Sequence, residues 1–179
     1  MQRITSAALL LYLWVMLILL GSLVLETFVI YPNIFYNAPE RFPIALQFMS
    51  VTGPAQFFRP LGMASVFLGA IALLVSWRIP SARWWVAASV LMILCEGVSS
   101  MLFFWPRNTI LFVEGAAQHS ADVLRQTANE FQTWHWSRLA FNAASAAFIF
   151  IGYLRFYRFT IVGQMEARER SADGPALAA

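Results

Sequence analysis

Three polar residues recur at helical spacing inside an apolar stretch near residue 140. Arg138, Asn142 and Ser145 stand at i, i+4 and i+7, so a helix through them points a cation, an amide and a hydroxyl in one direction. Such groups do not face lipid, because polar and charged side chains are expensive in hydrocarbon. The spacing therefore predicts a polar stripe that faces the interior of a helical bundle.

Further ionisable residues within or beside apolar segments could face this stripe. Glu26 lies near the end of the first segment, Arg59 opens the second and Glu96 lies within the third. With Arg138 they make two carboxylates and two guanidiniums, and intramembrane charges normally face the bundle and pair. Two interpretations stay open: a structural network that locks the helices together, or an outward-opening cavity in which Glu96 accepts a proton. Ser99 and Ser100, one turn beyond Glu96, could hydrogen-bond its carboxylate or satisfy backbone carbonyls.

The composition places these residues in a membrane protein. The 179 residues are 60% hydrophobic and only 12% charged, and the mean hydropathy is +0.64, far outside the range of soluble domains. All 12 basic residues are arginine, and the modest net charge of +3 gathers near helix ends, which argues against a nucleic-acid partner. Cys95 is the single cysteine, which excludes an intramolecular disulfide and a CxxC redox centre.

Apolar segments long enough to cross a hydrocarbon core predict the fold. A span needs about 20 helical residues, and the segments of that length are roughly 5–30, 60–78, 83–105 and 135–157. We therefore predict an all-α, four-transmembrane-helix bundle over residues 1–158, followed by a disordered polar tail over residues 159–179. The first segment exceeds a signal-peptide h-region and no cleavage site follows it, so we expect a retained span.

Arginine distribution predicts the orientation. Arginines precede the first span, flank the short Arg78–Arg83 turn and follow the fourth span. By the positive-inside rule, both termini and this turn are cytoplasmic, in a bacterial inner membrane. The two outer connections are longer. Residues 31–59 are Pro-rich and predict a structured lid, and residues 106–133 contain an amphipathic helix over about 116–131 that lies on the membrane surface or, alternatively, binds a ligand.

The two halves of the chain show a weak internal repeat. In the first half Glu26 precedes Tyr31-Pro32-Asn33, and in the second half Glu96 precedes Trp105-Pro106-Arg107-Asn108. Arg59 and Arg138 then open the two return helices. Since both hairpins start on the same side, such a repeat would be parallel. A stripe of small residues on the second span predicts close helix packing: Gly62, Ser65, Gly69, Ala72 and Ser76.

The outer region offers no convincing metal ligands. Both histidines lie there, with His135 between Trp134 and Trp136, but no Glu-x-x-His pair occurs. His119 and Asp122 share a helix face, and two ligands make a weak site. Phosphate-binding loops and nucleophile elbows are also missing from the sequence. We therefore expect no metal, haem or other cofactor.

Two short motifs resemble a known family. Pro106-x-Asn108-x-x-Leu111 follows the third span, and Trp134-x-x-x-Arg138 opens the fourth. The chain resembles the anthrone oxygenase-like family of small four-helix integral membrane proteins in these motifs, in its number of helices and in the lengths of its loops. Arg107 and the long Pro-rich loop after the first span depart from the family pattern.

The resemblance implies that dioxygen oxygenates an electron-rich phenolic or anthrone-type carbon without a cofactor. Such a substrate needs a base, for which Glu96 and His135 are candidates, and a cation such as Arg138 or Arg107 to hold its enolate oxygen. The further ligand-binding candidates are Glu26, Arg59, Asn108, Asn142 and Trp134. The rival hypothesis is a non-catalytic accessory or binding protein in which the buried charges are structural. Either is compatible with a homo-oligomer.

Overall fold

The computed structural model describes residues 2–173, and side chains as far as residue 166. Every regular element in this range is helical. In chain order, with η marking π-helical segments, the elements are α1 Gln2–Leu25, η1 Glu26–Ile30, α2 Tyr31–Ile34, α3 Phe42–Phe48, α4 Pro54–Ser76, α5 Pro80–Ser99, η2 Ser100–Phe104, α6 Trp105–Thr109, η3 Ile110–Glu114, α7 Gly115–Gln118 and α8 Ala121–Asp173.

Four continuous helical stretches are long and apolar enough to cross a membrane: Gln2–Ile34, Pro54–Ser76, Pro80–Gln118 and Ala121–Glu166. The chain is therefore a multi-pass integral membrane protein with an all-α fold, as its composition predicts. All four stretches are longer than predicted. Helix α4 begins earlier, at Pro54, and the other three continue past the apolar segments because the π-helical segments, or an unbroken α8, keep the chain helical.

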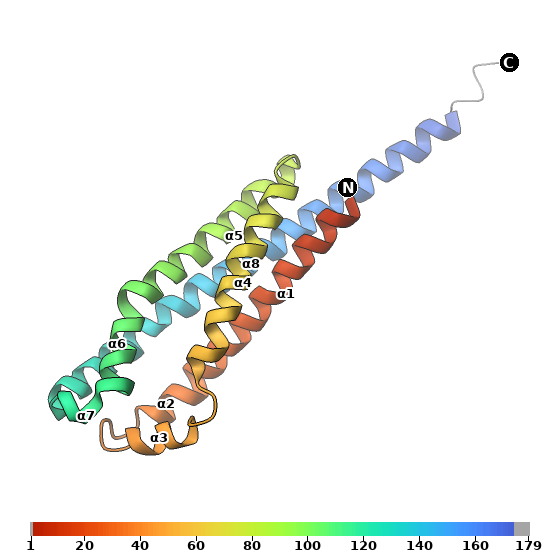
Figure 1. The fold of residues 1–179 in the computed structure, drawn as a ribbon. Helices are drawn as coiled ribbons and strands as arrows, with labels where there is room; N and C mark the ends of the chain where they lie inside the picture. Colours follow the sequence, from red (N-terminus) through yellow and green to blue (C-terminus); the bar gives the residue numbers. More distant parts are fainter. Residues whose placement is uncertain (1, 174–179) are drawn as a thin grey trace.

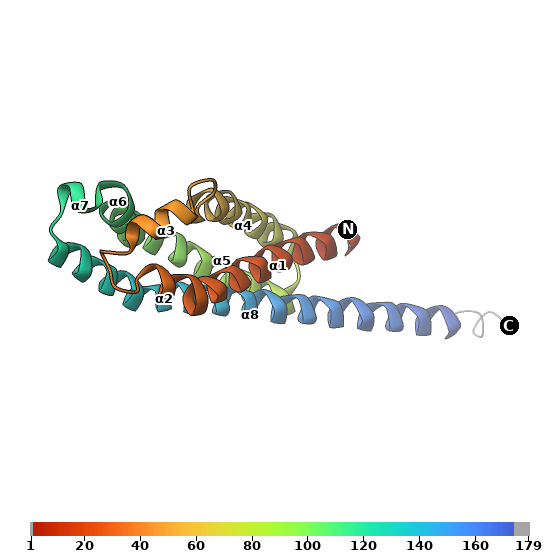
Figure 2. The ribbon, with the colours of Figure 1, turned by 90° about the horizontal axis from the view of Figure 1, so that it is seen from below.

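The four long helices form a bundle in which each packs against two neighbours. Helix α1 contacts α4 and α8, and α5 contacts the same two. Figures 1 and 2 show the N-terminus and the α4–α5 turn at one end, and the short helices α2, α3, α6 and α7 at the other. We call the latter end the headpiece, comprising residues 31–53 and 105–131.

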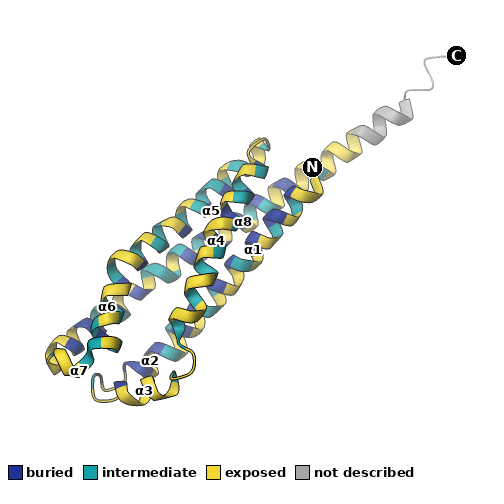
Figure 3. Ribbon diagram, viewed as in Figure 1, coloured by how far each residue is buried: buried dark blue, intermediate teal, exposed yellow. Residues whose placement is uncertain are grey.

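The bundle core is built on close approaches at small residues. The predicted stripe on α4 is confirmed at Ser65, Gly69, Ala72 and Ser76, which are its buried residues. Gly62, the fifth predicted member, is only half-buried, and a Cβ there would meet no atom within 4 Å. A Cβ at Gly69 would lie 3.1 Å from the Tyr12 ring, which shows how closely α1 and α4 approach. The outward faces of the long helices are exposed and apolar, as lipid contact requires (Figure 3).

The headpiece has a second, aromatic core. Tyr31, Phe35 and Phe42 from the first connection pack against Phe104 and Phe131 from the second half of the chain. The first connection is thus a packed lid. The predicted amphipathic stretch at 116–131 is not a separate helix: it is divided between the end of α7, at Gln118, and the start of α8, at Ala121.

An aromatic-proline pair follows each of the first two π-helical segments. Glu26–Ile30 precedes Tyr31-Pro32, and Ser100–Phe104 precedes Trp105-Pro106. Proline lacks an N–H and clashes with the preceding turn of an α-helix, so widening to a π-turn relieves the strain. This correspondence aligns Glu26 with Ser100, one helical turn from the pairing of Glu26 with Glu96 that the sequence suggested.

Helix α8 is 53 residues long and extends past the end of the bundle that carries the N-terminus (Figures 1 and 2). It remains helical to Asp173. Residues 159–173 are therefore a helix where the sequence predicted a disordered tail, because no proline interrupts the chain between Tyr157 and Asp173. Residues 174–179 of the predicted tail lie outside the described residues.

Candidate functional site

A buried ion pair connects α5 and α8. The Arg138 Nε donates to Glu96 Oε1 at 2.8 Å, and both side chains are 12% exposed. The Ser100 hydroxyl, at the start of η2, donates to the same oxygen at 3.0 Å. Arg138 comes from the predicted polar stripe, so the stripe does face an acidic residue of a neighbouring helix.

A second carboxylate, at the start of η1, approaches the same guanidinium. Glu26 is only 5% exposed and is attracted electrostatically to Arg138. The Tyr31 hydroxyl lies close enough to Glu26 and Arg138 to interact electrostatically with both groups. Oxygen Oε2 of Glu26 has no hydrogen-bond partner among the described residues. We call Glu26, Tyr31, Glu96, Ser100 and Arg138 the Arg138 cluster.

Aromatic rings cover the guanidinium of this cluster. The Arg138 Cζ lies 5.1 Å from the centroid of Phe104 and 5.8 Å from that of Phe58 on α4. Arg59, the neighbour of Phe58, does not join the cluster: its side chain is exposed and lies over the Trp105 ring at 5.6 Å. The predicted balance of two carboxylates and two guanidiniums is therefore wrong, since two carboxyl groups face one guanidinium.

His135 lies one turn toward the headpiece from Arg138, on the same face of α8. Its ring is 1% exposed and is enclosed by Tyr31, Phe104 and Phe131, with centroid distances of 4.6, 6.3 and 6.3 Å. The backbone of Leu23 approaches the ring, but neither ring nitrogen completes a hydrogen bond within the described residues. The polar atoms of His135 are thus buried without compensation.

Asn142 lies one turn from Arg138 in the opposite direction, deeper in the bundle. Its side chain is 0% exposed, and neither the amide nitrogen nor the amide oxygen has a partner among the described residues. Next to it in the bundle, the hydroxyls of Tyr12, Ser89 and Ser145 hydrogen-bond to one another. Tyr12 contacts Ser89 at 3.0 Å, and the hydroxyls of Ser89 and Ser145 lie 2.9 Å apart.

These groups form one polar column. His135, Arg138, Asn142 and Ser145 all lie on the buried face of α8, and at a rise of 1.5 Å per residue they span about 15 Å of the helix axis. The predicted interior orientation of the stripe is confirmed. Within the column, the Arg138 cluster and the hydroxyl group around Ser145 are bonded, while His135 and Asn142 flank the cluster unpartnered.

Arg107, Asn108 and Trp134 lie outside this column. Arg107 donates to Glu130 Oε2 at 2.8 Å and stacks over Phe103, in the headpiece. Asn108 is half-buried on α6, and Trp134 is half-exposed beside Phe103. These predicted ligand-binding residues therefore gather at the headpiece, away from the Arg138 cluster.

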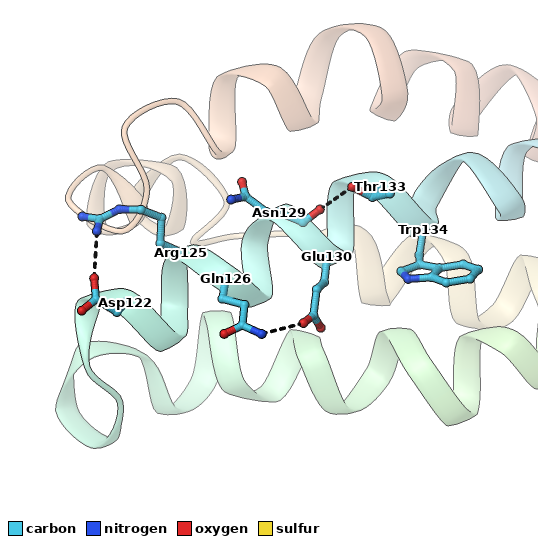
Figure 4. A pocket seen from close by; sticks show the side chains of 7 residues that line it. All are labelled: Asp122, Arg125, Gln126, Asn129, Glu130, Thr133 and Trp134. Atoms are coloured by element: carbon cyan, nitrogen blue, oxygen red, sulfur yellow. Dashed lines mark hydrogen bonds and ion pairs between the residues drawn. The ribbon is translucent and has the colours of Figure 1, made fainter.

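A shallow hollow of about 460 Å³ follows the first turns of α8 (Figure 4). Its lining is polar apart from one indole: Asp122, Arg125, Gln126, Asn129, Glu130, Thr133 and Trp134. The charged groups here satisfy one another, since Arg125 pairs with Asp122 and Gln126 donates to Glu130. Residues 2–166 contain no group of three or more His, Cys, Asp or Glu side chains that could hold a metal ion.

Comparisons with known proteins identify no relative of this chain. No protein-family model, no curated protein and no solved structure matches the chain. The functional argument therefore depends on the geometry of the polar column.

Sequence reasoning missed three residues that bond or lie against this column: Tyr12, Tyr31 and Ser89. Tyr12 carries no sequence cue beyond its place in an apolar helix. Tyr31 could have been found, because it stands five residues after Glu26 and precedes a proline. A π-turn has i to i+5 periodicity, so it brings the two side chains to one face.

Proposed function

We propose that the protein binds an amphipathic aromatic molecule at the Arg138 cluster and oxidises it with dioxygen, in the manner of the anthrone oxygenase-like proteins it resembles. One observation carries the proposal. Glu26 Oε2 and the polar atoms of His135 and Asn142 are buried and unpartnered in the described structure. A purely structural network in a membrane is expected to satisfy its polar groups, because each unpaired group costs free energy there.

Glu26 is the base in this proposal. Glu96 is already engaged by Arg138 and Ser100, whereas Glu26 keeps one carboxylate oxygen free. This revises the assignment from sequence, which favoured Glu96 or His135. The guanidinium of Arg138 and the hydroxyl of Tyr31 are positioned to stabilise the negative charge that develops on the substrate oxygen.

The reaction balances with dioxygen alone. Glu26 removes a proton from the activated CH₂ carbon of an anthrone-type ring, and the delocalised carbanion gives one electron to dioxygen. The resulting radical pair combines to a hydroperoxide, which takes up a proton and then loses water to leave a ketone. The sum is R₂CH₂ + O₂ → R₂C=O + H₂O, so the substrate supplies all the electrons and the protein supplies base and oxyanion stabilisation.

The arginine distribution supports an orientation for this chemistry. Arginines concentrate at the end of the bundle that holds the N-terminus and the Arg78–Arg83 turn. In a bacterial inner membrane that end would face the cytoplasm, and the headpiece would face outward. The Arg138 cluster lies toward the headpiece, so the substrate would enter from the outer leaflet.

Turnover of a hydroxylated anthrone tests the proposal. Protein in lipid nanodiscs is mixed with the anthrone in air, and both oxygen uptake and anthraquinone absorbance are followed above the protein-free rate. We expect Glu26→Gln to lower the rate by roughly 10²–10⁴, the usual contribution of a general base. Glu40→Gln, at an exposed headpiece carboxylate, is the matched control and should react like the wild type. A wild-type rate equal to the protein-free rate contradicts the proposal.

The non-catalytic alternative rests on the Arg138–Glu96 pair, which would stabilise a purely structural bundle. That alternative predicts that Glu26→Gln changes stability but no ligand-dependent property. Turnover and stability measured on the same variant therefore separate the two hypotheses.

A further inference from the structure

The headpiece end of α4 is held differently from the rest of the bundle. The buried residues of α4 begin at Ser65 and continue to Ser76. None of the residues 54–64 is buried, although Phe58 and Leu61 pack partly against the core. The first three turns of α4 therefore rest on the bundle, whereas the remaining turns are fixed within it.

Polar contacts do not fasten this segment. The side-chain hydrogen bonds of α4 stay within the helix and its cap, at Gln56, Ser65 and Ser76. Within the described residues no hydrogen bond or ion pair joins α4 to α5, η2 or α6. At the headpiece end, α4 contacts α6 through the stacking of Arg59 over Trp105, with the Arg59 Cζ 5.6 Å from the ring centroid. Trp105 is itself 47% exposed, and exposed cation–π contacts are weak.

A proline lies within the loosely held segment, five residues before the first buried residue of α4, Ser65. Pro60 lies inside α4, where it removes one backbone hydrogen bond and crowds the carbonyl four residues earlier. Helices bend at such positions. At the other side of this bend, Gly69 presses on the Tyr12 ring and holds the remainder of α4 in place.

We propose that residues 54–61 of α4 form a movable gate, through which a membrane-dissolved ligand reaches the Arg138 cluster from the headpiece-side leaflet. Phe58 is the covering residue, because its ring lies over the Arg138 guanidinium at 5.8 Å, and the Arg59–Trp105 contact is the latch. Outward bending at Pro60 exposes the guanidinium to the hydrocarbon. The ligand class is then a flat, lipid-soluble molecule with an acidic hydroxyl or carbonyl group. That identity rests on the proposed function, whereas the existence of the gate does not.

Cysteine labelling tests the gate without reference to turnover. The reporter is Ser100→Cys in a Cys95→Ala background, since Ser100 belongs to the Arg138 cluster and is buried. The protein in nanodiscs is labelled with a lipophilic maleimide and, separately, with a charged, membrane-impermeant thiol reagent. Asn142→Cys serves as a second reporter, on another helix, if the first variant does not fold.

Loss of the Arg59–Trp105 contact should increase the rate of labelling by the lipophilic reagent. We expect Arg59→Ala to raise the rate roughly two- to fivefold, the population change that follows loss of an exposed cation–π contact. Trp105→Ala should do the same, with no further gain in the double variant. Pro60→Ala restores a backbone donor and should lower the rate.

A matched control lies at the opposite end of the α4–α5 pair. Arg83 stacks over Trp84 at 5.2 Å and Trp77 at 6.0 Å, so Arg83→Ala removes the same type of contact away from the proposed gate and should leave labelling unchanged. Equal effects of Arg59→Ala and Arg83→Ala overturn the gate, as does faster labelling by the charged reagent. If the labelling rate depends on Arg59 and Trp105 as expected but no anthrone is turned over, the gate is supported and the oxygenase proposal is rejected.

Discussion

Replacing Asn142 should make the protein more stable and less active. The Asn142 side chain is fully buried, and neither its donor nor its acceptor is bonded among the described residues. An unsatisfied buried group costs about 1–3 kcal/mol, and leucine has the same branching and number of side-chain heavy atoms without a polar atom. We therefore expect Asn142→Leu to raise the free energy of unfolding by about 1–3 kcal/mol and to weaken binding of an aromatic ligand, as at sites where stability is given up for function.

Ser145 provides the comparison for this prediction, because its side chain is also buried but is hydrogen-bonded. Ser145 lies three residues further along the same buried face, but its hydroxyl donates to the Ser89 carbonyl at 2.9 Å. Ser145→Ala breaks that bond and should cost about 1–3 kcal/mol. Both variants can be unfolded by denaturing detergent, with helicity followed by circular dichroism. If Asn142→Leu loses as much stability as Ser145→Ala, the amide is satisfied and the reasoning from unpartnered groups is refuted.

The ion pair, helix contacts and headpiece give further expectations for the same unfolding assay. Glu96→Gln leaves a buried guanidinium without its principal partner and should cost about 3–5 kcal/mol; a loss below about 1 kcal/mol would mean that the pair is solvated. Gly69→Ala should destabilise by about 1–3 kcal/mol, since its Cβ would lie 3.1 Å from Tyr12. Gly21→Ala, with open space around its Cβ, should be neutral or stabilising by up to about 1 kcal/mol. Equal effects of the two glycine changes would contradict the packing. Glu130→Gln, at a part-exposed pair, should cost no more than about 1 kcal/mol and less at high salt; a larger loss would show that the headpiece depends on that pair.

Helical spacing was sufficient to find the polar column. Arg138, Asn142 and Ser145 share a face at any α-helical pitch, and the structure places all three toward the bundle interior. Continuing the same spacing outward reaches His135. The prediction succeeded because a long helix keeps its periodicity, whatever it packs against.

Charge counting could not decide which arginine enters the cluster. Arg59 and Arg138 both stand at the start of a return helix, so the spacing does not distinguish them. In the structure α4 packs tightly only from Ser65 onward, which leaves Arg59 exposed. That difference depends on how α4 sits against its neighbours, and this is a property of the whole bundle.

Backbone details at the headpiece needed the structure for the same reason. The amphipathic stretch before His135 contains no proline or glycine from Ala121 onward, so the absence of a helix breaker did indicate that α8 would run through. The π-turn that aligns Glu26 with Tyr31 has only the following proline as a cue. Helix registers that depart from the α period remain hard to assign from spacing alone.

Binding of a redox-inert hydroxylated anthraquinone most directly tests whether the Arg138 cluster is a ligand site. Tryptophan fluorescence quenching in nanodiscs can be titrated for the wild type, Glu26→Gln and Glu40→Gln. The proposal predicts saturable binding by all three proteins, with turnover of the corresponding anthrone lost in Glu26→Gln alone. An absence of saturable binding by the wild type, with Glu26→Gln altering stability only, would contradict the proposal and leave the buried charges as a structural network.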